Sequence, residues 1–206
     1  MDKEKNTSEG QGTRAAQQLR APFLILFSTF FILSGCFNIR PVEPPSSSAS
    51  NWVSPTDYQI LLNNLQLSVN QRNVQNYLRC FNQDKLDFQP VASLFNNNEN
   101  IWVNWSISDE QAYFDNFVAD LAVNTGNSLS LTETDLQDVT SDSLKYVGDY
   151  LLRVNHSDTS LTTLFQGQLQ LVIKLNAFNE WEIERWTDIE IYPDSSWSEL
   201  KLRYVQ

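Results

Sequence analysis

The sequence predicts an α+β domain in which a curved antiparallel sheet packs against about three N-terminal helices. Apolar residues recur every three or four positions between residues 58 and 121, which indicates amphipathic helices. After Gly126 the period changes to two, which indicates strands with one dry face. Gly148 and Gly167 lie inside unusually long predicted strands, so we expect the sheet to bend.

An apolar segment ahead of this domain is interpreted as part of a signal peptide. Residues 21–35, APFLILFSTFFILSG, carry no charge and follow Arg14 and Arg20. A run of 15 residues is shorter than the roughly 20 that a transmembrane helix needs, but it fits the hydrophobic region of a secretory signal. We therefore predict a signal peptide over residues 1–35.

The apolar segment ends in a lipidation motif. Leu33-Ser34-Gly35-Cys36 resembles the lipobox of bacterial lipoproteins. The resemblance implies that Cys36 receives acyl chains such as palmitate and becomes the first residue of the mature chain. More than one acyl chain is needed for stable attachment to a bilayer.

The predicted anchor sets the domain organisation and the cellular location. Residues 36–51 are rich in Pro and Ser, and such a segment is expected to stay extended as a flexible linker. Residues 52–206 then form the folded domain, held by lipid at a membrane of the bacterial cell envelope. Phe37 stands where an Asp would favour the inner membrane, so in a Gram-negative cell we expect the outer membrane, facing the periplasm.

The charge of the chain argues against two classes of partner. The formal net charge is −11, and the chain without residues 1–35 has 10 basic and 22 acidic side chains, a net charge of −12. Such a surface repels phosphate backbones, so nucleic acid is not expected as a partner. Attachment to anionic lipid through a basic patch is not expected either.

The two cysteines do not form a scaffold. If Cys36 carries lipid, Cys80 has no partner for a disulfide. Cys80 lies beside Phe81 in an amphipathic segment, which favours a buried structural thiol. The sequence has no Cys/His cluster and no phosphate-binding or nucleotide motif, so no metal or cofactor is expected.

Two predicted helices follow the linker. The first begins in Ser54-Pro55-Thr56-Asp57, with Ser54 as its N-cap. The second carries an apolar stripe from Val74 to Phe81. Phe88-Gln89-Pro90 is expected to be extended, because residues before proline avoid helical angles.

A third helix precedes the sheet. The Asn-rich segment 94–105 is expected to be mainly a loop, and Ser108 with Gln111 forms a capping box that opens the helix. Period-two segments then cover residues 128–139, 146–156, 163–175 and 181–191.

The order of elements resembles the NTF2-like fold, a cone-shaped α+β barrel, as found in uncharacterised envelope lipoproteins. The resemblance covers roughly residues 52–203 and rests on this order and on scattered aromatic motifs. These motifs are Tyr77 to Phe81, Phe88-Gln89-Pro90, Phe165-Gln166-Gly167, Trp181 to Asp188 and Trp197 to Lys201. It implies a cone whose interior, in some enzymes of this fold, holds an Asp, His or Tyr that acts on small molecules.

The ligand-binding candidates are Arg185, Tyr77 and Tyr150. Arg185 has the same strand parity as Trp181 and Ile183, so it is predicted to face the cone, either as a structural arginine paired with an acid or as a clamp for an anionic ligand. Tyr77 and Tyr150 are the inward tyrosines that the resemblance implies. No catalytic residue is assigned.

Other polar and aromatic side chains are expected to lie outside the cone. Asp188 has the strand parity opposite to that of the apolar residues, so it is placed on the solvated face. His156, the one histidine, is expected at the surface near a strand end. Trp186 has the same outward parity as Asp188. Together with Trp197 it is predicted to form an interaction surface.

These features favour a non-catalytic, membrane-anchored lipoprotein whose domain binds a small apolar or anionic ligand or an envelope protein. Two alternatives stay open. One is an isomerase or dehydratase that uses the cone, and the other is a structural subunit of an envelope assembly.

Overall fold

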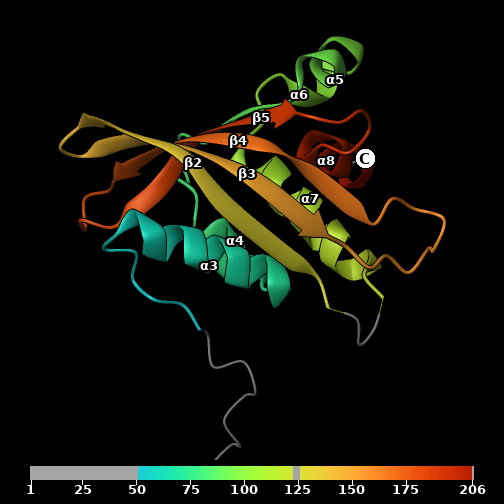
Figure 1. The fold of residues 1–206 in the computed structure, drawn as a ribbon, viewed down its shortest axis with the longest axis horizontal. Coiled ribbons are helices and arrows are strands. Elements are labelled where there is room, and N and C mark those ends of the chain that lie inside the picture. The colour runs from blue at the N-terminus through green and yellow to red at the C-terminus, as the bar shows by residue number, and fades with distance from the viewer. Residues whose placement is uncertain (1–50, 123–125, 206) are drawn as a thin grey trace, which may run out of the picture. The chain divides into compact units, whose positions relative to one another are not determined.

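The computed structural model describes residues 51–122 and 126–205 (Figure 1). The predicted signal peptide and lipobox, and all but the last residue of the linker, lie outside the described residues, so lipidation of Cys36 stays a prediction. Within the described ranges, no helix is both long enough and apolar enough to cross a membrane.

Helix α3 spans Tyr58–Asn70, and its N-cap is Asp57 rather than the predicted Ser54. The Asp57 carboxylate accepts a hydrogen bond from the backbone N–H of Gln59 at 2.7 Å. An aspartate in this place satisfies a free amide of the first turn and also favours the positive end of the helix dipole. The apolar stripe of α3 is buried as predicted, at Leu61, Leu62, Leu65 and Val69.

The segment between α3 and the sheet is more helical than expected. Helix α4, Val74–Leu78, is followed by the short strand β1, Asp87–Gln89, which confirms the extended prediction there. The Asn-rich segment is not a loop, because it forms helices α5, Ala92–Asn97, and α6, Glu99–Trp102. A hydrogen bond joins the two helices: the Trp102 indole N–H donates to the Leu94 carbonyl at 3.2 Å.

Helix α7, Ile107–Asp120, is the predicted third helix, but its capping box is displaced by two residues. The Asp109 carboxylate accepts from the backbone N–H of Ser106 at 2.8 Å. Ser106 and Asp109 therefore take the roles expected of Ser108 and Gln111. Aspartate is also the better residue here, because its charge favours the first turn.

Four long antiparallel strands form the sheet, as predicted. The strand order is β1-β5-β4-β3-β2, and β1 pairs with β5 in parallel. Helices α3, α4, α7 and α8 lie against one side of the curved sheet (Figure 1). The long strands are β2, Ser128–Thr140; β3, Ser143–Arg153; β4, Leu164–Leu175; and β5, Trp181–Glu190.

A further helix, α8, Trp197–Tyr204, follows the sheet and was not predicted. Its N-cap is Ser196, whose hydroxyl accepts from the backbone N–H of Glu199 at 3.2 Å. The helix buries Ser198 and Lys201 as well as apolar residues, so its sequence shows no clean apolar stripe.

A β-bulge in β5 reverses the predicted orientation of half the strand. Ile183 pairs with Ile173 and Arg185 pairs with Val172, so Glu184 is an extra residue in the ladder. Ile183 is buried as predicted, but beyond the bulge Trp186 faces the core and Arg185 faces solvent.

The prediction that Arg185 points into the cone is therefore wrong. Its side chain is half exposed, and its Nε lies 2.6 Å from the Asp87 carboxylate of the neighbouring strand β1. Arg185 is paired with an acid, but outside the cone.

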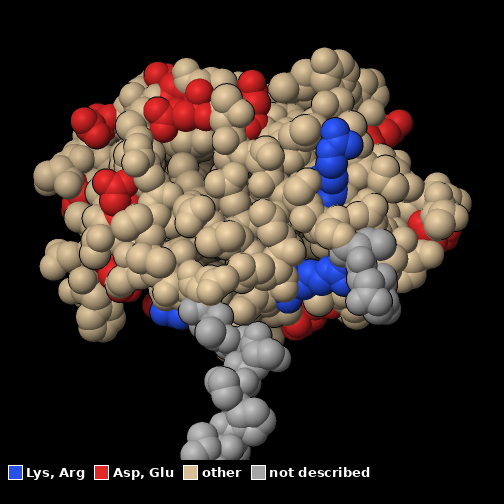
Figure 2. Space-filling view, turned by 60° about the horizontal axis from the view of Figure 1, so that its bottom comes forward, with Lys and Arg blue, Asp and Glu red and all other residues tan. Residues whose placement is uncertain are grey.

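Acidic side chains gather on part of the surface. Figure 2 shows one face of the domain on which Asp and Glu cluster toward one end, while Lys and Arg are sparse. This agrees with the large negative charge of the chain.

Candidate functional site

A buried ion pair occupies the space between α7, α8 and the sheet. Lys201 of α8 and Glu110 of α7 are both fully buried, and the Lys201 Nζ lies 2.8 and 2.6 Å from the two carboxylate oxygens. The Tyr77 hydroxyl donates to the same carboxylate at 2.5 Å, and the Trp105 indole N–H donates at 2.8 Å. Glu110 is thus surrounded by protein donors.

Aromatic rings enclose the ammonium group of Lys201. Its Nζ lies 3.6 Å from the centre of the Phe88 ring and 4.1 Å from that of Trp186. Such contacts stabilise a cation that has lost its water. Burial lowers the pKa of Lys201 to about 8, although the Glu110 carboxylate acts in the opposite direction. Sequence reasoning missed Glu110 and did not propose a role for Lys201, because neither belongs to a recognisable motif.

A second buried carboxylate, Asp188, joins the sheet to α8. One of its oxygens accepts from the Tyr150 hydroxyl at 2.9 Å. The other accepts from the backbone N–H and the hydroxyl of Ser198, both at 2.6 Å. Asp188 was predicted on the solvated face, and the β5 bulge explains the error. Burial raises the pKa of Asp188, while these hydrogen bonds lower it in part.

The two candidate tyrosines lie in the core, each beside a carboxylate. Tyr77 contacts Glu110, and its ring stacks on Phe114 with ring centres 3.7 Å apart. Tyr150 contacts Asp188, and its hydroxyl also accepts from the backbone N–H of Trp197 at 2.7 Å. Burial is the main cause of the raised pKa of both phenols. Each hydroxyl is therefore used to hold the protein together.

The proposed tryptophan surface is wrong. Trp186 and Trp197 are both completely buried, and their rings meet edge to face at 4.7 Å. The Trp197 indole N–H donates to the Tyr113 hydroxyl at 2.9 Å. The β5 bulge turns Trp186 inward, and helix α8 carries Trp197 into the core.

His156 is also buried, contrary to expectation. Its Nε2 lies 2.9 Å from the Thr162 carbonyl oxygen, and its Nδ1 lies 2.6 Å from the Tyr204 hydroxyl. Burial lowers the pKa of His156. The ring links the end of β3 to α8, which is a structural role.

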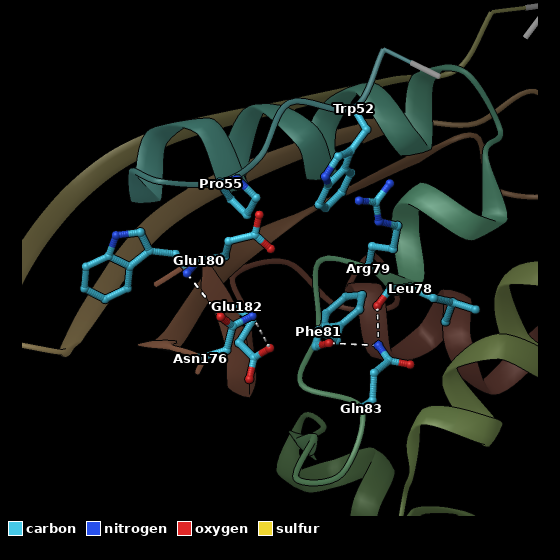
Figure 3. Close-up of a pocket in the computed structure, with 10 residues that line it drawn as sticks. Trp52, Pro55, Leu78, Arg79, Phe81, Gln83, Asn176, Glu180 and Glu182 are labelled. Carbon is cyan, nitrogen blue, oxygen red and sulfur yellow. Dashed lines mark hydrogen bonds between the residues drawn. The ribbon is translucent and has the colours of Figure 1, made fainter. Parts of the chain in front are cut away.

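A groove at the edge of the domain is the more accessible candidate site (Figure 3). It has a volume of about 210 Å³ and is lined by residues from the segment before α3, from the end of α4 and the residues after it, and from the start of β5 and the turn before it. Trp52 and Arg79 lie on one side of it, and Glu180 and Glu182 lie on the other (Figure 3). Its remaining lining residues are Pro55, Leu78, Phe81, Gln83, Asn176 and Trp181.

The Trp52 side of the groove is fixed by two contacts. The Asn64 side chain on α3 bonds both backbone groups of Val53, accepting at 3.3 Å and donating at 2.6 Å. The backbone N–H of Trp181 donates to the Pro55 carbonyl at 2.8 Å. The chain next to Trp52 is thus tied to both α3 and β5.

Arg79 ends α4 and stacks on Trp52. The guanidinium carbon lies 4.1 Å from the centre of the indole ring. Over residues 51–122 and 126–205, Arg79 forms no ion pair and its guanidinium has no hydrogen-bond acceptor. Neither Trp52 nor Arg79 was predicted as a site residue, since Trp52 follows the predicted linker and Arg79 ends a short helix.

Metal chemistry has no candidate centre in the described part of the chain. No group of three or more His, Cys, Asp or Glu residues is placed there to hold an ion. Cys80 is fully buried, as predicted, and burial raises the pKa of its thiol.

Comparison with known proteins extends the description of the fold. No family model and no curated protein matches the sequence. Among solved structures, the chain is similar to a type 2 hexachlorocyclohexane dehydrochlorinase at 13% identity and a TM-score of 0.51, over 66% of this chain and 83% of that one. It is also similar to a candidate scytalone dehydratase from Novosphingobium aromaticivorans at 8% identity and a TM-score of 0.51, over 63% of this chain and 78% of that one.

A further neighbour is an NTF2-like superfamily protein from Salmonella enterica serovar Typhimurium, at 12% identity and a TM-score of 0.45, over 64% of this chain and 88% of that one. The fold is NTF2-like, as the order of the elements predicted, and the two neighbours with a TM-score of 0.51 share this architecture. At these identities the NTF2-like neighbours show the architecture alone, and the chemistry must be argued from the residues of this chain.

Proposed function

We propose that the protein is a lipid-anchored, non-catalytic binding protein of the bacterial cell envelope, whose domain takes a small ligand in the groove beside Trp52. One observation supports the proposal that the domain is non-catalytic. The buried ion pair of Lys201 and Glu110 fills the middle of the cone, where an enzyme of this fold would need room for a substrate. The lipobox resemblance at Cys36 supports the anchor.

The acids inside the cone are poorly suited to catalysis. A general base must reach the proton that it removes from a substrate. Glu110 accepts from Tyr77, Trp105 and Lys201, and Asp188 accepts from Tyr150 and Ser198. Both carboxylates are enclosed by donors of the protein itself.

An isomerase or dehydratase is the second candidate function. The contact of Tyr150 with Asp188, whose pKa is raised, favours it, and two of the structural neighbours carry the names of a dehydratase and a dehydrochlorinase. Turnover of a small substrate by the purified protein, lost in Asp188→Asn, would replace the binding proposal with this one. The structural-subunit alternative loses its support, because Trp186 and Trp197 are buried.

Metabolic labelling tests the anchor. Bacteria that produce the full chain are grown with labelled palmitate, and the protein is isolated by an affinity tag at its C-terminus. We expect label on the wild type and none on Cys36→Ala. Cys80→Ala is the matched control, because Cys80 is the one other cysteine, and it should keep the label. An unlabelled wild type would refute the anchor.

A further inference from the structure

We infer that the groove between Trp52, Arg79 and Glu182 binds a small zwitterion with the size and charges of a free amino acid. This inference rests on the proposed function and names the class of ligand. The groove presents a cationic wall, Arg79, and an anionic wall, Glu180 and Glu182, which form no ion pair with each other, and apolar side chains also line it.

The cationic wall suits a carboxylate. Arg79 lies with its guanidinium against the Trp52 ring, and stacking of this kind leaves the N–H groups at the edge of the plane free to donate. A guanidinium binds a carboxylate through two parallel hydrogen bonds. No carboxylate of the described residues takes this place, although the chain is strongly acidic.

The anionic wall suits an ammonium group. Glu182 accepts hydrogen bonds from the side-chain amides of Asn82 and Asn176, and Glu180 accepts from the Ser54 hydroxyl. These donors are neutral, and within the described ranges neither Glu180 nor Glu182 forms an ion pair. A carboxylate has about four acceptor sites, so capacity is left for a ligand.

The size of the groove limits the ligand. Its volume of about 210 Å³ is below the roughly 300 Å³ at which pockets for drug-sized molecules begin. Pro55, Leu78 and Phe81 supply the apolar part of its lining. A free amino acid with an aliphatic side chain matches this combination of charge, volume and apolar surface.

Matched ligands test the charge requirement. The full-length protein in detergent micelles is titrated in a calorimeter with L-leucine, with 4-methylpentanoate, which lacks the ammonium group, and with 3-methylbutylamine, which lacks the carboxylate. We expect leucine to bind at least tenfold more tightly than either analogue. Equal binding of 4-methylpentanoate would reduce the groove to an anion site and overturn the inference, as would no binding of leucine.

Matched variants test the location. Arg79→Gln should weaken leucine binding at least tenfold, and the double variant Glu180→Gln/Glu182→Gln should do the same. Arg185→Gln is the control, because Arg185 is an exposed arginine that does not line the groove, and it should bind like the wild type. Unchanged binding in Arg79→Gln would refute the site.

Two further measurements keep the result interpretable. Thermal unfolding shows whether each variant is folded. If Arg79→Gln does not fold, Arg79→Lys takes its place as the test. This variant keeps the charge but loses the bidentate guanidinium, so it should bind leucine with an affinity between those of the wild type and a variant without the charge. Palmitate labelling separates the two proposals. A labelled protein that binds none of the three ligands leaves the anchor standing and refutes the ligand class.

Discussion

The stability of the domain interior depends on how the buried ammonium group of Lys201 is compensated. A buried ammonium group loses its hydration, and here the Glu110 carboxylate and the rings of Phe88 and Trp186 replace it. Removing one member of a buried pair leaves the other charge uncompensated. Replacing both members by neutral groups of similar volume is often harmless.

This difference gives a prediction for three variants. Lys201→Met should lower the free energy of unfolding by about 3–5 kcal/mol, because Glu110 would remain buried without its cation. Adding Glu110→Gln to Lys201→Met should recover most of that loss. Urea denaturation of the wild type, both single variants and the double variant measures the coupling. A double variant no more stable than Lys201→Met alone would contradict this account of the pair.

The same lysine predicts a gain of stability at alkaline pH. The pKa of Lys201 is lowered from 10.5 to about 8 in the folded state, so between pH 8 and 10 the unfolded chain binds the proton more tightly. The free energy of unfolding should therefore rise from pH 8 to 10, by at most about 1.4 kcal/mol per pH unit. The Lys201→Met/Glu110→Gln variant should lack this rise. An equal rise in both proteins would assign it to other groups.

At the scale of elements, the sequence predicted what depends on local periodicity. The change from period 3.6 to period two located α3, α4, α7 and the four long strands, because each packs one face on the core. Apolar periodicity did not reveal helix α8, because this helix buries the polar residues Lys201 and Ser198. Their hydrogen-bond partners lie on other elements. Such pairings cannot be seen in a single sequence.

The predicted orientation of the side chains in β5 was wrong beyond one position, for a related reason. The prediction assumed strict alternation along β5, and one extra residue in the ladder, Glu184, shifted every side chain after it. That single change placed Arg185 outside, and it turned Trp186 and Asp188 inward. The bulge is a property of pairing between β4 and β5. Of the candidate sites, the groove was missed altogether, because Trp52, Arg79 and Glu182 come from three separate segments.

Gly167 shows how tightly the sheet is packed around Tyr150. A Cβ atom at Gly167 would lie 2.6 Å from the Tyr150 hydroxyl oxygen and 2.7 Å from the Ile189 carbonyl oxygen. We expect Gly167→Ala to destabilise the protein by about 1–3 kcal/mol, because the backbone of β5 must move. Gly126→Ala is the control, since a Cβ there meets no atom of the described residues within 4 Å. Thermal unfolding compares the two, and equal stability would contradict the described packing.

At the scale of the whole molecule, the domain separates its core from its binding surface. The cone of this NTF2-like fold is closed by the chain's own C-terminal helix, which brings Trp197 and Lys201 into the interior. The groove lies instead at the edge of the domain where Trp52 follows the predicted linker. The proposed anchor at Cys36 would tether the domain to a membrane through that linker.

The indole N–H signals of the tryptophans test this separation most directly. A ¹H–¹⁵N spectrum of the full-length protein in micelles is recorded during titration with L-leucine, and the signals are assigned by Trp→Phe substitution. We predict that the Trp52 signal moves and saturates, while those of Trp186 and Trp197 stay in place. Movement of the Trp186 and Trp197 signals with Trp52 unchanged would put the ligand inside the cone and contradict the account.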